Sequence, residues 1–321
     1  CVKPENIMYR PPTGLVKRLG DITLRCCVCF IPLLQFDNPN GICLINASNR
    51  CSWNTTPSIT NQEECMSGRP YVLAETNWKT VKDTDYQVAL LPWGATEAHN
   101  YHLPYCTDVV QCDRIGAEAA RIAWEQGAKV ILLPTVPFGV NTGQLDIKLD
   151  LNMNPSTQLA VLKDIAYALE RQGIPKLVVM NGHGGNDFKQ MIRELLPQFN
   201  LFICTVDWYR SVDLSNIFDN QGDHADEMET SLMQLFTPDW VLPLFEAGDG
   251  AENAFKLQGL REGWAWTQRD WPKATNDTGV GDPSAATPEK GQQCLDAVSR
   301  QIGQFLADLA AADVNDLYES N

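Results

Sequence analysis

Short apolar runs alternate with amphipathic segments along the chain from residue 66 onward. Strands buried on both faces have continuous apolar runs, and such runs cover residues 87–92, 129–134, 176–180 and 201–206. Elsewhere, apolar residues recur every three or four positions, which is the spacing of one helix face. This second pattern predicts helices over residues 113–126, 155–173, 187–196, 227–236 and 287–311.

Apolar strands joined by helices indicate a mostly parallel sheet that helices cover on both faces. The pattern therefore predicts an α/β fold with three layers, α/β/α, for residues 66–321. Ligands of such sheets bind beyond the carboxyl ends of the strands. Two histidine-containing segments begin directly after predicted strands, so we expect a site at that edge.

The first 65 residues differ from the rest in pattern and composition. They lack regular periodicity, hold seven of the eleven cysteines, and carry a charge of +1 (six Lys/Arg, five Asp/Glu) against −16 for the remainder (19 and 35). They suit a disulfide-bonded secreted module, a segment behind a cleaved lipoprotein signal with Cys1 as lipid anchor, or a non-native extension ahead of Met66. We favour the non-native extension, on a cytoplasmic protein, because the segment has no regular pattern and the later cysteines resemble scattered reduced thiols.

The whole chain, at 44% hydrophobic and 20% charged, has a globular composition and a net charge of −15. Such a charge disfavours binding to nucleic acid or to an anionic membrane surface. No apolar run reaches the ~18–20 residues of a membrane span. We therefore expect neither nucleic acid nor a membrane as the main partner.

All four histidines lie in short segments rich in carboxylates and glycines. Imidazole combined with carboxylate suits Zn, Mn or Fe. The distribution predicts a metal site assembled from three distant parts of the chain, which are residues 94–108, 181–186 and 223–231.

In the first segment, Glu97 and His99 project to the same side of an extended chain, because they are two residues apart. Asp108 follows near the start of a predicted helix. The alternative is that Glu97 is solvated and Asp108 only caps the helix. His102 is equally suited to coordinate a metal or to orient another ligand.

In the second segment, Asn181-Gly-His183-Gly-Gly-Asn186, successive glycines allow positive φ and a sharp reversal that presents His183 at a strand end. The following helix would aim free N–H groups at negative charge. One alternative is a phosphate-binding loop, but neither glycine-rich nucleotide motif is present. Another is a histidine satisfied within a tight turn.

In the third segment, His224 and Glu227 share one face of a predicted helix, and Asp226 and Glu229 share another. An acidic run at a helix start often only complements the helix dipole. The histidine favours a function here, but spacing does not decide which carboxylate takes part. The sequence contains no Gly-x-Ser-x-Gly elbow and no His-Glu-x-x-His helix.

Together, Gly94-Ala-Thr-Glu97-Ala-His99, Asn181-Gly-His183-Gly-Gly-Asn186 and Glu229-Thr-Ser resemble, in the correct order, the motifs of the creatininase (creatinine amidohydrolase) family. The likeness covers most of residues 70–310. It implies a creatininase-like three-layer fold, typically assembled as a hexamer. It also implies two divalent metal ions per chain, Zn or Mn, at a centre that hydrolyses non-peptide or cyclic C–N amide bonds.

The resemblance also implies roles for individual residues. Glu97 and His183 would bind one metal and His99 the other, with Asp108 bridging both. Creatininase has a glutamate where this chain has Gly185, and Glu229 is our candidate replacement.

The remaining candidates fall into groups by expected role. The proton donor to the leaving nitrogen would be His224, Asp226 or Glu227. Residues expected to contact substrate are Trp208, Gly184 and Gln221. Residues expected to support the ligands are His102, Asn181 and Asn186.

Several positions depart from the creatininase pattern. An aromatic residue is replaced by Gly184, a Trp-Asp pair by Asn220-Gln221, and the loop over residues 139–155 is altered. We therefore expect an amidohydrolase that acts on a small cyclic amide or formamide other than creatinine. The alternatives are a peptide-processing member of the family and a non-catalytic, metal-stabilised binding protein.

Overall fold

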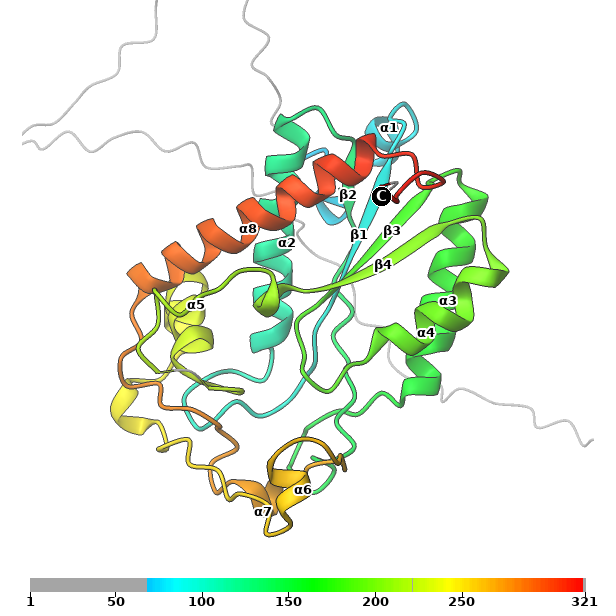
Figure 1. Ribbon diagram of the computed structural model, residues 1–321. Coiled ribbons are helices and arrows are strands. Elements are labelled where there is room, and N and C mark those ends of the chain that lie inside the picture. Colours follow the sequence, from blue (N-terminus) through cyan, green and yellow to red (C-terminus); the bar gives the residue numbers. More distant parts are fainter. Residues whose placement is uncertain (1–67, 221, 320–321) are drawn as a thin grey trace, which may run out of the picture. The chain divides into compact units, whose positions relative to one another are not determined.

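The computed structural model describes residues 68–220 and 222–319 (Figure 1). The predicted extension over residues 1–65 and the candidate Gln221 lie outside the described residues. The boundary at residue 65 therefore stays a prediction.

In the described part of the chain, parallel strands form a sheet in the order β2-β1-β3-β4. Each strand lies within two residues of a predicted one at its amino end. The helix after β1 covers one face of the sheet and the helix after β3 covers the other (Figure 1). Sheets of this kind bind ligands at the carboxyl ends of the two strands where the connections diverge. The strands are β1 Val88–Trp93, β2 Val130–Leu132, β3 Lys176–Asn181 and β4 Phe202–Asp207.

Helices cover both faces of the sheet, which confirms the three-layer α/β/α fold (Figure 1). Helices α2, α5 and α8 lie on one face, and α3 and α4 lie on the other. The α-helices are α1 Trp78–Val81, α2 Thr107–Glu125, α3 Pro155–Arg171, α4 Phe188–Leu195, α5 Glu227–Phe236, α6 Gln258–Arg261, α7 Trp271–Ala274 and α8 Pro288–Ala311.

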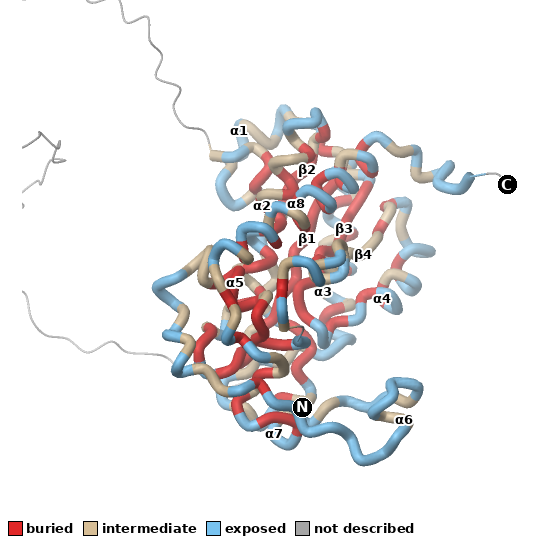
Figure 2. Tube along the Cα trace, turned by 60° about the vertical axis from the view of Figure 1, so that its left-hand side comes forward, coloured by how far each residue is buried: buried red, intermediate tan, exposed pale blue. Residues whose placement is uncertain are grey.

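The side chains of β1 alternate between the two cores, as the pleat of a strand requires. Val88 and Leu90 pack on the side of α2 and α8, whereas Ala89 and Leu91 pack on the side of α3 and α4. Buried positions follow the strands and the inner faces of the helices (Figure 2). A strand buried on both sides must be apolar throughout, which is why the sequence pattern was informative here.

Helix α2 begins at Thr107 and not at residue 113 as predicted. Its first turns contain Thr107, Asp108 and Gln111, which are polar and yet buried. This part of the helix faces the predicted site rather than an apolar core. The spacing of apolar residues therefore does not reveal where this helix begins.

Two further findings concern membrane-spanning helices and the cysteines of the described residues. None of the helices in the described ranges combines the length and apolar character that a membrane crossing needs. The cysteines at positions 106, 112, 204 and 294 are free thiols.

Lys176 begins β3 with its side chain against the end of α8. Its Nζ donates hydrogen bonds to the carbonyl oxygens of Leu309, Ala310 and Ala312 at 2.6, 3.1 and 2.8 Å. The C-terminal carbonyls of a helix carry partial negative charge, so they stabilise the ammonium group, although burial lowers the pKa of Lys176.

We expect Lys176→Met to lower the free energy of unfolding by about 2 kcal/mol, because these carbonyl oxygens lose a charged donor. Urea denaturation measures the change. Lys163→Met is the control, since Lys163 is exposed and donates to the Gln198 side chain on the surface. A loss for Lys176→Met no larger than that of the control contradicts this account of the β3–α8 contact.

Candidate metal centre

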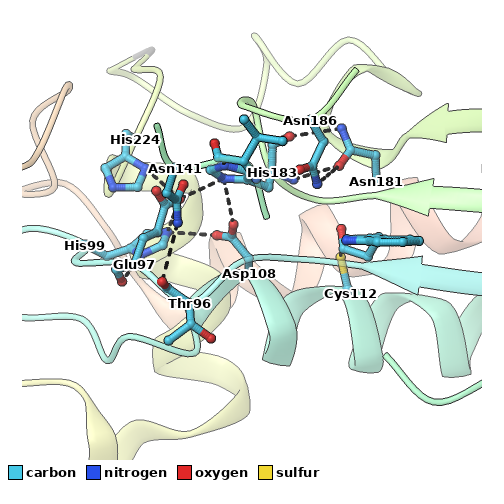
Figure 3. Close-up of polar contacts among 12 residues, drawn as sticks. Thr96, Glu97, His99, Asp108, Cys112, Asn141, Asn181, His183, Asn186 and His224 are labelled. Atoms are coloured by element: carbon cyan, nitrogen blue, oxygen red, sulfur yellow. Dashed lines mark hydrogen bonds and ion pairs between the residues drawn. The ribbon is translucent and has the colours of Figure 1, made fainter. Parts of the chain in front are cut away.

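The carboxyl ends of β1 and β3 bring two candidate segments together. Trp93 pairs with Asn181 in the register of the sheet, so residues 94–99 and 182–186 leave the sheet side by side. The third segment enters from the start of α5. Figure 3 shows the candidate side chains pointing toward one another, and all are buried; they are Glu97, His99, Asp108, His183 and His224.

The donor atoms of the candidate ligands form three groups, and two of these share Asp108; the third group is Glu97, His99 and His224. Of the two groups that share Asp108, one is made by Glu97, Asp108 and His183 and the other by His99, Asp108 and Glu229; within each, the atoms lie within 4.8 Å of one another. Asp108 Oδ1 is 2.8 Å from His99 Nε2, and Oδ2 is 3.2 Å from His183 Nδ1. One oxygen thus faces each of these two groups, as a carboxylate that bridges two cations requires.

Backbone carbonyls fix the orientation of the three histidine rings. His99 Nδ1 lies 3.1 Å from the Glu97 carbonyl oxygen, and His183 Nε2 lies 3.1 Å from that of Val140. His224 Nε2 lies 2.8 Å from the Ala98 carbonyl oxygen. A carbonyl only accepts, so each of these nitrogens donates its N–H and leaves the other nitrogen free toward the carboxylates. Metal-binding histidines are held in this way.

The charges of the cluster also fit divalent cations. Glu97, Asp108 and Glu229 are buried together, and among the described residues their ion pairs are with histidines alone. Burial raises the pKa of Glu229 to about 8. Asp108 Oδ2 is buried without a hydrogen-bond donor. A cation in each group that shares Asp108 would compensate this charge and supply the missing partner.

Desolvation disfavours a charged His99, yet Asp108 and Glu229 raise its pKa to about 10. The raised pKa shows that the carboxylates of the cluster attract positive charge in spite of burial. The residues present therefore fit the metal centre that the sequence predicted.

His224 lies beside the two groups that share Asp108, and it lines the cavity that opens in front of them. Its ring centroid is 4.1 Å from that of His99 and 4.9 Å from that of Trp271. The free Nδ1 lies 3.8 Å from Glu97 Oε1. This position suits either a further ligand or a group that transfers a proton.

The two acids that follow His224 belong to none of the ligand groups, although Asp226 lines the same cavity. Asp226 caps α5, because its carboxylate accepts from the backbone N–H groups of Glu229 and Gly222 at 3.1 and 3.0 Å. Glu227 is fully buried and accepts from the Asn220 N–H at 2.7 Å and from the Lys290 ammonium. Glu227 contacts neither ligand group, so its position favours a structural role over that of an acid.

Asn181 and Asn186 hold the glycine loop in place. Asn181 donates to the His183 carbonyl at 3.0 Å and accepts from the His183 N–H at 3.1 Å. Asn186 donates to Asn181 Oδ1 at 3.0 Å and accepts from the Val140 N–H at 3.1 Å. The loop and the carbonyl that orients His183 are therefore parts of one network.

His102 and Gln144 support the ligands from outside the two groups. His102 Nε2 lies 2.8 Å from Thr230 Oγ1, next to Glu229, which favours the supporting role over coordination. Gln144 donates from Nε2 to Glu97 Oε2, while Glu97 Oε1 faces His183 Nδ1 at 2.8 Å. Gln144 belongs to none of the sequence motifs. Its segment, the loop over residues 139–155, departs from the creatininase pattern. A single glutamine in that loop, however, has no spacing that would identify it as a site residue.

The glycine loop differs from the prediction in one respect. None of its glycines has a left-handed φ, so the expected positive φ is wrong. Close packing requires two of them instead. A Cβ at Gly182 would meet Cys112 Sγ at 2.2 Å, and one at Gly185 would meet the Val140 carbonyl oxygen at 2.3 Å.

A cavity of about 760 Å³ opens in front of the ligand groups. Three sets of side chains share its lining. The polar set at the centre comprises Glu97, Asp108, His183, His224 and Glu229. Trp208 and the exposed Gly184, two of the residues expected to contact substrate, also line it. The apolar set includes Tyr209, Phe218, Phe255, Trp266 and Trp271.

Comparison with known proteins places this fold and site in a family. Residues 74–306 match the creatininase family model, described as creatinine amidohydrolase. The chain therefore belongs to the creatininase family, which confirms the resemblance seen in its motifs. It is 28% identical to the mycofactocin precursor peptide peptidase of Mycobacterium ulcerans (strain Agy99) over 66% of this chain and 83% of that protein.

Solved structures agree with the family match. The crystal structure of a "putative creatinine amidohydrolase" from Bacteroides fragilis NCTC 9343 is 40% identical, with a TM-score of 0.73, and covers 78% of this chain and 99% of that one. Two creatininases, one of Zn-Zn type and one named Mn, share the fold at 23% identity and a TM-score of 0.61. They cover 75% and 74% of this chain and 98% of their own.

Proposed function

We propose that this chain is a metal-dependent hydrolase that cleaves an amide C–N bond in a short peptide. The observation that carries the proposal is the pair of ligand groups that share Asp108 beside the large cavity. Each group offers imidazole and carboxylate donors, which suit Zn or Mn. The Zn-Zn and Mn forms of creatininase support this choice of metals.

Each residue of the centre has a proposed task. Glu97, Asp108 and His183 would hold one ion, and His99, Asp108 and Glu229 the other. When bound, such a pair of ions supplies a nucleophilic water near neutral pH and polarises a carbonyl oxygen. His224 holds its Nε2–H against the Ala98 carbonyl, so Nδ1 is the atom that would take a proton from the attacking water and pass it to the leaving nitrogen.

The size of the cavity favours a peptide over a small cyclic amide. Pockets of roughly 300–1,000 Å³ bind drug-sized ligands, and this one measures about 760 Å³. A small cyclic amide leaves most of that space empty. The relative that is named a precursor peptide peptidase supports the same choice.

A cyclic amide or formamide is the second candidate, because the family model is described as creatinine amidohydrolase. In either case, the small-molecule partner, the homo-oligomer and the cytoplasmic location stay predictions.

A substrate panel tests the proposal. The full chain, loaded with Zn or with Mn, is assayed against short peptides, lactams and formamides, with chelator-treated protein as the control. We expect hydrolysis of at least one peptide, and its loss with the chelator. Turnover of lactams or formamides alone would favour the second candidate. Bound metal without any turnover would instead support the non-catalytic binding protein.

A further inference from the structure

The glycines of the loop around His183 are not equivalent. Gly182 and Gly185 have no room for a side chain, because a Cβ at either would lie 2.2–2.3 Å from a neighbouring atom. Gly184 lies between the candidate ligand and Gly185, and a Cβ built on it meets nothing within 4 Å. Its φ is also outside the left-handed region. The described fold therefore requires glycine at 182 and 185 but not at 184.

The position of Gly184 shows what its missing side chain provides. Gly184 is exposed and lines the cavity, directly after His183 in the chain. A side chain at this position would extend from the lining of the cavity next to His183, where the structure leaves open space. With glycine, this part of the lining carries no side chain.

We propose that Gly184 determines the substrate class of this site, by leaving room for a substrate whose chain continues past the scissile amide. This inference rests on the proposed metal-dependent hydrolase. A compact cyclic amide ends within a few atoms of the scissile carbonyl, so it does not use this room. A peptide has residues on both sides of the scissile bond and needs a way out of the centre on each side.

Aromatic residues in the lining of the cavity suit such an extended substrate. Phe255 and Trp266 line the cavity, and Trp266 is 83% exposed. An exposed tryptophan in a cavity that also holds ionisable groups is a surface that a bound apolar side chain would cover. A chain that leaves the centre over Gly184 fills a cavity of this size, whereas a small amide does not.

Two phosphinates with the same charge test the inference without knowledge of the natural substrate. One is dimethylphosphinate, and the other is a phosphinic pseudopeptide with two residues on each side of the phosphinate. Isothermal titration of metal-loaded full chain measures both affinities in the wild type, Gly184→Ala and Gly184→Leu. Metal content and the thermal midpoint of each metal-free variant are measured alongside, and Gly185→Ala serves as the contrast within the loop.

We expect the wild type to prefer the pseudopeptide, and Gly184→Leu to reduce that preference by at least ~10-fold, which corresponds to about 1.4 kcal/mol. Dimethylphosphinate affinity, metal content and thermal midpoint should stay close to those of the wild type. Gly184→Ala should show a smaller reduction in the same direction. Gly185→Ala should lose metal, because its Cβ would lie 2.5 Å from His183 Nε2.

Two results would overturn the inference while leaving the hydrolase in place. One is an unchanged preference in both Gly184 variants, and the other is an equal loss of affinity for both probes. If the wild type binds neither metal nor phosphinate, the proposed function itself fails. The Gly184→Ala variant decides the matter if Gly184→Leu does not fold.

Discussion

Asp108→Ala is expected to empty both metal positions and to reduce kcat/KM by more than about 100-fold. Removing a group that only orients a ligand costs roughly 10–100-fold in affinity or activity, and Asp108 faces both ligand groups directly. Its loss should therefore cost more than the upper end of that range. Inductively coupled plasma mass spectrometry measures the metal, and steady-state kinetics on the best substrate of the panel measures the activity.

Asp113→Ala is the matched control, because Asp113 is an exposed carboxylate on the same helix. It should keep the metal content and activity of the wild type. The metal-free Asp108→Ala protein should stay folded, since it has one fewer carboxylate in a buried acidic cluster. An Asp108→Ala protein that retains both ions and full turnover would show that Asp108 does not bridge them.

Glu229→Gln is expected to remove the ion of the second group alone and to reduce kcat by about 100-fold, comparable to the cost of one transition-state contact. Glu229 Oε1 lies 3.8 Å from His99 Nε2, whereas no atom of Glu229 belongs to the group of Glu97 and His183. The variant should therefore bind one ion per chain. The same two measurements, metal content and kcat, test it.

Glu227→Gln separates ligand loss from a general disturbance of α5. Glu227 begins the same helix but pairs with Lys290 and with the Asn220 N–H. We expect this variant to have a lower thermal midpoint and an unchanged metal content. If Glu227→Gln loses the ion and Glu229→Gln keeps it, the two roles are reversed.

The sequence predicts the fold best where burial requires a regular spacing of apolar residues. The strands of this sheet are buried on both faces, so each reads as an apolar run, and α8 has one apolar face through Val298, Ile302 and Leu306. The start of α2 was missed for the opposite reason. Its first turns face the metal centre, and buried polar residues such as Asp108 and Gln111 have no apolar period.

Within the site, the motifs predicted which segments meet but not which way each side chain points. Helical spacing would place His224 and Glu227 on one face, but His224 precedes α5, which begins at Glu227. Glu227 turns toward Lys290 on α8, a contact between residues 63 positions apart. Gln144 reaches Glu97 across 47 positions. Such contacts depend on how loops and helices pack. Local spacing therefore cannot predict them.

The glycine loop is a second case in which packing, and not local spacing, decides which residue fits. The resemblance to creatininase implies a glutamate at the position of Gly185, and Glu229 is the candidate replacement. The structure gives a physical reason why this loop excludes a side chain there, since a Cβ would approach Val140 and His183 too closely. Glu229, from α5, lies where it can complete the second group instead.

The metal content of the full chain, after loading with Zn or Mn and removal of excess ion, tests the central claim most directly. The shared-carboxylate geometry predicts about two ions per wild-type chain, about one in Glu229→Gln and almost none in Asp108→Ala. A wild-type chain that binds less than one ion, or an Asp108→Ala chain that binds as much as the wild type, would contradict it.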